Sequence, residues 1–278
     1  MGQYELVTAG SAEGVEMAVE TYIDRARTRV RAEREAVDAK LDAYETFTRQ
    51  VRELETETSP SSMGRTTTAG ATHLATDGSG SDRCWTVRTA FAETVRPHSI
   101  ADVDESESLL ETIREEFTDA IAVALAPTTV TSFTPELKQM VLSQAESRRS
   151  EVAALQRALG REDARLDSAA ESVDEIVDWL VDANETPLTH LGFDALKQRH
   201  ETLASHRDRC ADVARDRQAF LQETTNEGLD ADVHHHTLVP YLYQEFAVDH
   251  PVLTTVATVD ETCRECQRVV RDHLVRRA

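Results

Sequence analysis

A run of apolar residues at alternating intervals of three and four, interrupted only by Glu162, constrains the fold of this chain most. Such spacing keeps one stripe on one side of a helix, where only another helix can bury it. At about 1.5 Å per residue the stripe is about 42 Å long, too long for an ordinary compact domain. Its positions are Val152, Leu155, Leu159, Glu162, Leu166, Ala169, Val173, Ile176 and Leu180.

The helix that carries this stripe has clear signals at both ends. Thr134 supplies an N-cap oxygen, and Pro135 occupies the first helical position, where its missing N–H costs nothing. The helix is predicted to break at residues 184–187, which include a proline. A second stripe with the same spacing follows over residues 193–221. A short connection between two such stripes favours an antiparallel hairpin over residues 134–226.

Four polar residues interrupt the two stripes: Glu162, His200, Arg207 and Arg217. Polar groups at buried seam positions can fix the register of two helices. The favoured alternative is that these long side chains reach solvent from the edge of the seam. Both interpretations stay open at the level of the sequence.

The predicted fold is all-α: an elongated antiparallel coiled-coil hairpin with an additional long N-terminal helix and a small helical head. An amphipathic helix that starts near residue 13 is expected within residues 1–57. Residues 58–83, rich in Ser, Thr and Gly, read as a flexible linker. Residues 84–278 form the helical domain that contains the hairpin. Its segments 84–133 and 229–278 are expected to make the head, at one end of the hairpin or along its shaft.

Two helices are predicted in the first of these segments. A short helix over residues 84–95 is expected to turn Trp85, Val87 and Phe91 inward. One longer helix is expected over residues 105–125, where the apolar stripe is broader than a coiled-coil seam.

The composition indicates a salt-rich solvent. The net charge is −21, and only three of the 30 basic residues are lysine. This composition suits the cytoplasm of an extreme halophile, where the Debye length falls to about 3 Å at 1 M salt and self-repulsion is screened. High net charge also favours disorder, but the 40% hydrophobic content, arranged in stripes, argues against disorder for most of the chain.

The chain is predicted to be cytoplasmic and to stay away from membranes. No stretch approaches the roughly 18 apolar residues of a membrane span, and residues 1–5 lack the features of a secretory signal. Four cysteines in so long a chain do not suggest a disulfide scaffold, so reduced thiols are expected.

Five arginines lie between Arg25 and Arg34. They read either as a basic stripe for phosphate or RNA, or as a solvated helix face that pairs with Asp24, Glu33 and Glu35. The second interpretation is favoured, because a chain of charge −21 repels nucleic acid and molar salt weakens binding by counterion release. No nucleic-acid partner is therefore expected.

The sharpest candidate for chemistry is the Cys-x-x-Cys pair Cys263 and Cys266. A tetrahedral zinc would need two more ligands, which His234, His236 or Cys210 would supply. Packing is the favoured alternative, because both cysteines fall on the apolar stripe of the last helix and cysteine is a good small core residue. No other cofactor is expected.

Several short segments resemble an uncharacterised family of acidic haloarchaeal coiled-coil proteins with a domain of unknown function. The segments are residues 30–35, 87–95, 109–126, 133–137 and 193–196, and they flank or belong to an arginine- and alanine-rich coil. The resemblance implies no activity and no catalytic or binding residues.

No catalytic motif is present in the sequence. There is no Gly-rich phosphate loop, no nucleophile elbow and no His-Glu-x-x-His, so no enzymatic activity is predicted. The predicted function is that of a cytoplasmic interaction or scaffold protein. It binds a protein partner through a coiled-coil seam, or a second copy of itself. The alternative is a metal-binding regulator that uses Cys263 and Cys266.

Overall fold

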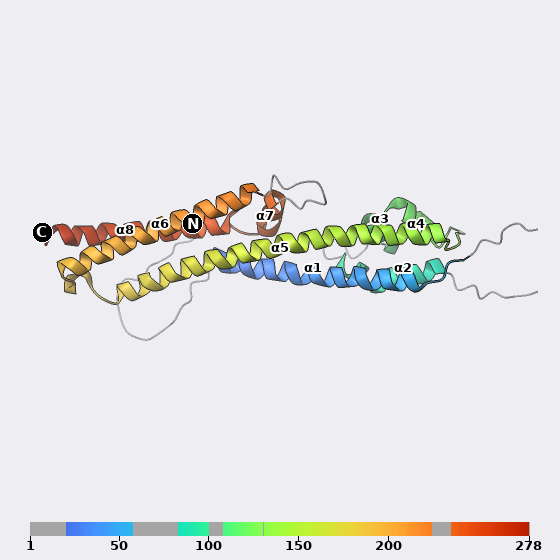
Figure 1. Ribbon diagram of the computed structural model, residues 1–278, viewed down its shortest axis with the longest axis horizontal. Coiled ribbons are helices and arrows are strands. Elements are labelled where there is room, and N and C mark those ends of the chain that lie inside the picture. The colour runs from blue at the N-terminus through green and yellow to red at the C-terminus, as the bar shows by residue number, and fades with distance from the viewer. Residues whose placement is uncertain (1–20, 58–82, 100–107, 130, 224–234, 278) are drawn as a thin grey trace, which may run out of the picture.

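The structure, a computed structural model, describes residues 21–57, 83–99, 108–129, 131–223 and 235–277. These ranges contain eight α-helices, two short 3-10 helices and no strand, which confirms the all-α class. The molecule is elongated, with the long helices nearly parallel to its longest axis (Figure 1). No helix within the described ranges combines the length and the apolar character that crossing a bilayer requires.

The axis of the molecule is α5, a helix of 50 residues that extends for about 75 Å (Figure 1). It starts and ends where the sequence predicts. The Thr134 hydroxyl accepts a hydrogen bond from the N–H of Leu137 at 3.3 Å, and Pro135 is the first helical residue. The helices are α1 (Tyr22–Glu53), α2 (Arg83–Glu93), α3 (Leu109–Glu116), α4 (Asp119–Leu125), α5 (Pro135–Asn184), α6 (Phe193–Glu223), α7 (His235–Tyr243) and α8 (Pro251–Val275), with the 3-10 helices Arg96–His98 and Leu188–His190.

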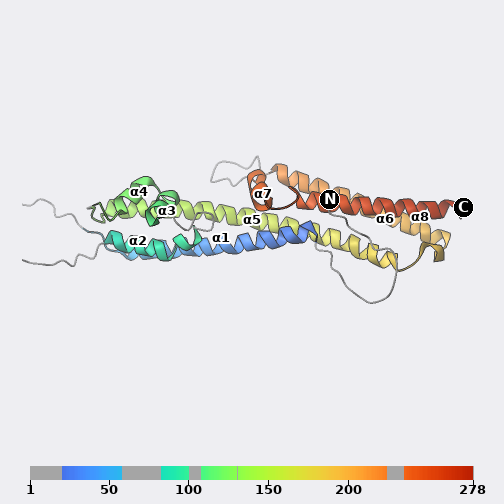
Figure 2. The ribbon, with the colours of Figure 1, turned by 180° about the vertical axis from the view of Figure 1, so that it is seen from behind.

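The long helices pair differently from the predicted hairpin. Although α6 does return antiparallel to α5, the closest packing of α5 is with α1, and that of α6 is with α8 (Figures 1 and 2). The prediction that the two stripes of residues 134–226 bury mainly each other is therefore wrong. The physical reason is that α1 and α8 carry stripes of their own, so each arm of the hairpin covers one of them.

Two hydrophobic cores lie one after the other along α5. The first core contains the second half of α1, the helices α2 to α4 and the start of α5. The second core contains the first half of α1, the rest of α5, and α6 to α8. Val152 packs against both. The predicted single head of residues 84–133 and 229–278 is wrong, because α8 buries its 25-residue stripe along α6 in the second core.

The first core is closed by three phenylalanines in mutual contact. The ring centroids of Phe47, Phe91 and Phe117 lie 5.3–5.8 Å apart, a spacing typical of aromatic pairs. Val87 and Phe91 face inward as predicted, but Trp85 does not, since 58% of its surface is exposed. Cys84, one residue earlier, is buried instead.

The helix predicted over residues 105–125 is two helices. The first, α3, ends at Phe117, whose backbone leaves the helical region. The Thr118 hydroxyl then caps α4 by accepting a hydrogen bond from the N–H of Ile121 at 3.3 Å. The pair Thr118-Asp119 is an N-cap signal that the apolar pattern concealed.

Parts of the sequence predictions fall outside the described residues. Within them α1 begins at Tyr22, after Thr21 forms a capping box with Asp24, and the predicted start near residue 13 lies outside. So do the linker, apart from its last residue, Arg83, and the predicted end of the hairpin near residue 226. The division of the chain into domains at residues 58–83 stays a prediction.

Replacing Gly160, in the interior of α5, by alanine should stabilise the protein by about 0.5–1 kcal/mol. A methyl group at this position meets nothing within 4 Å, and glycine is a poorer helix former than alanine. The unfolding temperature measures the effect. The control is Gly192→Ala. A methyl group at this position also meets nothing within 4 Å, but the residue precedes α6 and is not in a helix interior. Equal gains in both variants would contradict the explanation by helix propensity.

Candidate functional site

The most deeply buried charged group among the described residues is Glu162 of α5. The Arg217 guanidinium on α6 donates to both of its carboxylate oxygens, at 2.8 and 2.7 Å. The hydroxyl of Tyr243 on α7 donates to Glu162 Oε1 at 2.6 Å. Glu162 and Arg217 therefore pair across helices instead of reaching solvent, as the register interpretation requires. Arg207 is instead half-buried and donates to Asp260 on α8 at 3.0 Å.

The Tyr243 hydroxyl is held in its protonated form. Burial, and then the negative charge of Glu162, raise the pKa of Tyr243 well above its usual range. A protonated phenol supplies the third donor that the buried carboxylate needs. We call Glu162, Arg217 and Tyr243 the second-core triad, and it ties three helices together at one point.

A similar network lies in the first core, around Glu116 at the end of α3. Its carboxylate accepts hydrogen bonds from Lys40 Nζ at 2.8 Å, from Arg148 Nη2 at 3.2 Å and from the Tyr44 hydroxyl. Burial alone would raise the pKa of Glu116. Hydrogen bonds from Lys40 and Tyr44 and the charge of Lys40 outweigh burial and lower that pKa to about 2. We call these four residues the first-core cluster.

Sequence reasoning missed Glu116, Tyr44 and Tyr243 as members of polar networks. Nothing in the sequence marks the hydroxyls of Tyr44 and Tyr243 as members of a network. One signal for Glu116 existed: it lies three and four residues after Ile113 and Thr112, on the face of α3 that is buried. In both networks every charged group has a partner of opposite charge, which is typical of groups that hold a fold together.

The cysteine pair occupies two different environments. Cys263 is fully buried, whereas Cys266 is half-buried. Burial raises the pKa of Cys263 to about 12 and that of Cys210, on α6, to about 11. Among the candidate ligands, His234 lies outside the described residues, and His236 is in α7 with an undescribed side chain. Within the described ranges, no three His, Cys, Asp or Glu side chains are placed to hold a metal ion.

Cys263 should react with a thiol reagent roughly a thousand times more slowly than an exposed cysteine at pH 8. A thiol with a pKa of about 12 has very little thiolate at that pH, and only the thiolate attacks. Mass spectrometry of partly alkylated protein measures the rate at each site. Cys266 should react before Cys263, and all four should react in denaturant. Equal native rates at these two sites would contradict the burial described here.

The arginines of α1 point mainly toward α5. Arg27 Nε donates to Asp167 at 2.7 Å, Arg31 Nη2 donates to the same carboxylate at 3.1 Å, and Arg34 pairs with Asp163. The remaining two arginines of this run stay near their own helix or α7: Arg29 pairs with Glu33 at 2.8 Å, and Arg25 lies over the ring of Phe246. The run therefore joins α1 to α5, a role that neither interpretation of the sequence included.

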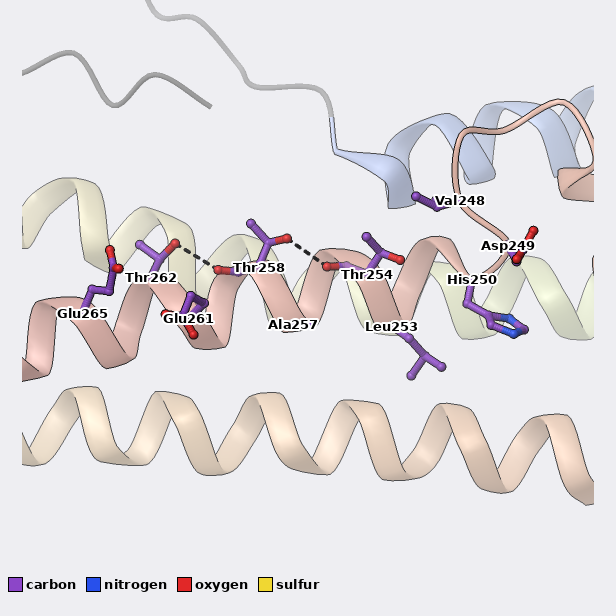
Figure 3. A pocket seen from close by; sticks show the side chains of 10 residues that line it. All are labelled: Val248, Asp249, His250, Leu253, Thr254, Ala257, Thr258, Glu261, Thr262 and Glu265. Atoms are coloured by element: carbon purple, nitrogen blue, oxygen red, sulfur yellow. Dashed lines mark hydrogen bonds between the residues drawn. The ribbon is translucent and has the colours of Figure 1, made fainter. Parts of the chain in front are cut away.

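An open hollow of about 780 Å³ runs along α8 (Figure 3). The hydroxyls of Thr258 and Thr262 point back at their own helix and donate to the carbonyls of Thr254 and Thr258 at 3.0 Å. The ionisable groups that line the hollow are Asp249, His250, Glu261 and Glu265. A hollow so open gives no enclosed site in which a substrate would be desolvated.

The last turns of α5 expose apolar side chains. Val177 and Val181 lie one turn apart, and 61% of the surface of Val181 is exposed. Phe193, the first residue of α6, is also exposed. We call Val177 and Val181, with the neighbouring Asp174 and Asp178, the distal face.

A sequence profile of the domain of unknown function DUF7260 matches residues 21–267. The chain belongs to the DUF7260 family. The match begins at the residue that caps α1 and ends within α8, so the DUF7260 domain includes both cores. The expected membership of a family of unknown function is confirmed. No curated protein and no solved structure matches the chain significantly.

Proposed function

We propose that this chain is an interaction protein of a halophile's cytoplasm. It holds a protein partner at the distal face of its helical rod. The single observation that carries the proposal is the exposure of Val177 and Val181, one turn apart on the same side of α5. Exposed apolar side chains rimmed by charges are typical of surfaces that bind another protein.

The two polar networks support this proposal. Among the described residues, the buried carboxylates of Glu116 and Glu162 each accept hydrogen bonds from side chains on other helices. They give the rod a fixed register and so present the distal face on a rigid support. The charge of −21 and the scarcity of lysine support a salt-rich cytoplasm as the place of action.

Crosslinking in cells at native salt, followed by mass spectrometry, tests the proposal. We expect crosslinks from one protein partner to residues at the end of α5 and the start of α6. Crosslinks only within the chain would reject the proposal. Crosslinks between two copies would show that the partner is the protein itself.

The alternative is a metal-binding regulator that uses Cys263 and Cys266. Its support is the Cys-x-x-Cys spacing of Cys263 and Cys266 on α8. Elemental analysis of protein purified without chelator decides the matter. Stoichiometric zinc would favour this alternative, and its absence would reject it.

A further inference from the structure

The face of α5 that contacts α1 continues beyond the point where α1 begins. Along it, residues recur at steps of three and four, or of seven, which keeps them on one side of the helix. The first part of this face lies against α1, whereas Asp174, Val177 and Val181 at its end are exposed. Its positions are Gln156, Asp163, Asp167, Ala170, Asp174, Val177 and Val181.

Where α1 covers this face, the contacts show what the face accepts. Acidic residues of α5 bind arginines at the edge of α1, as Asp167 binds Arg27 at 2.7 Å. Polar pairs continue the match, since Gln156 Nε2 donates to Asp38 at 2.6 Å. Between these edges, apolar residues of α1 such as Val30 are fully buried. The occupant of the covered part is thus an amphipathic helix with arginines along its edge.

Beyond Asp174 the pairing of α5 with α1 ends, because α1 starts at Tyr22. Asp174 is still within electrostatic range of Asp24 and Arg27. Val177 and Val181 are exposed, and Asp178 adds a second carboxylate beside them. The uncovered part keeps the two properties of the covered part, an apolar centre and an acidic edge.

We infer that the distal face binds an amphipathic helix with arginines along its edge, supplied by a partner protein. The inference rests on the proposed function and names the chemistry of the partner. The docked helix extends the line of α1 along α5, so its apolar side chains cover Val177 and Val181. Its arginines pair with Asp174 and Asp178, as those of α1 pair with Asp163 and Asp167. Pairs in direct contact are no farther apart than the Debye length of about 3 Å in molar salt, and so survive there.

Charge argues against two other occupants. Residues 1–20 contain four glutamates and no lysine or arginine, so they would set carboxylates against Asp174 and Asp178. A second copy that docked through the same face would bring identical acidic edges together.

A peptide with the sequence of residues 21–38 of this chain is the probe, because it carries both the stripe and the arginines of α1. Its binding to the full chain is followed by fluorescence anisotropy. We expect saturable binding, weakened about ten-fold or more in the double variant Val177→Asp/Val181→Asp, which loses apolar contact and adds repulsion to any acidic group of the peptide. The matched control is Val123→Asp, an equally exposed valine on α4 at the other end of the rod. It should bind as the wild type does.

A second peptide, with all five arginines replaced by glutamate, tests the charge requirement without altering the protein. It should bind the wild-type chain about ten-fold more weakly or worse. Equal binding of the two peptides, equal binding to both protein variants, or no binding to the wild type would overturn the inference. Binding only after removal of residues 1–20 would assign the face to that segment and overturn it too.

Sedimentation of the chain alone tests the remaining possible occupant, a second copy of the chain. A dimer that the double variant Val177→Asp/Val181→Asp dissociates would assign the face to a second copy and overturn the inference. The proposed function fails separately. It is rejected when crosslinking finds no protein partner at the distal face, whereas failure of the peptide tests rejects only the helix chemistry inferred here.

Discussion

Replacing Arg217 by methionine should lower the free energy of unfolding by about 3–5 kcal/mol. The change leaves the Glu162 carboxylate fully buried with no cation, because Arg217 supplies both of its charge-assisted hydrogen bonds. The Tyr243 hydroxyl alone does not offset the lost hydration of a carboxylate. Chemical denaturation followed by circular dichroism measures the loss.

Two further variants separate the buried charge from the loss of a side chain. Arg215→Met removes an exposed arginine whose partner, Asp212, lies on the same helix, and should cost less than about 1 kcal/mol. Adding Glu162→Leu and Tyr243→Phe to Arg217→Met removes the orphaned groups and should recover much of the loss. If Arg217→Met cost no more than Arg215→Met, the triad would not hold the second core together.

Acid should destabilise the first core through Glu116, and Glu116→Gln should remove that part of the acid sensitivity. The folded-state pKa of about 2 lies below the ordinary value of 4.5, so the ionised form favours the folded state. This contribution, about 3 kcal/mol, is present in full above pH 5 and is lost as the pH falls toward 2. We therefore expect Glu116→Gln to be less stable than the wild type at pH 7, and the difference to shrink steadily below pH 5.

The control for this prediction is Glu115→Gln, a substitution of the adjacent, exposed glutamate. It removes the same charge from the chain but no buried hydrogen bond, so its stability should follow that of the wild type from pH 7 to pH 2. Unfolding free energies of the three proteins across this range make the comparison. A difference between Glu116→Gln and the wild type that does not change with pH would contradict the assigned cause.

The two ends of α5 could be predicted from the sequence, but the partners of the long helices could not. Thr134 and Pro135 mark the start of α5 because capping is a local interaction between residues three apart. A stripe of apolar residues, in contrast, says only that a helix must be covered. Four long helices here carry such stripes, and nothing in three-and-four spacing tells which stripe covers which. The choice of α1 over α6 as the neighbour of α5 depends on side chains far apart in sequence, such as Arg27 and Asp167.

The polar networks were predictable only where they interrupt a stripe. Glu162 and Arg217 stand out because each replaces an apolar residue in a regular series. Glu116 does not stand out, since it is one of 51 acidic residues and ends a short helix that the sequence pattern merged with the next. For the cysteines, two interpretations were open from the sequence. Burial of Cys263 agrees with packing, and the zinc alternative stays a prediction that elemental analysis tests.

The unbroken course of α5 through both cores makes the protein hard to divide. A fragment that ends near Val152 would keep α1 but lose the cover of its first half, and a fragment that starts there would lack α1 and so expose the face of α5 that α1 buries. Neither half is therefore expected to be a folded fragment, and expression trials should begin with the whole span. The DUF7260 profile matches residues 21–267 and so spans both cores.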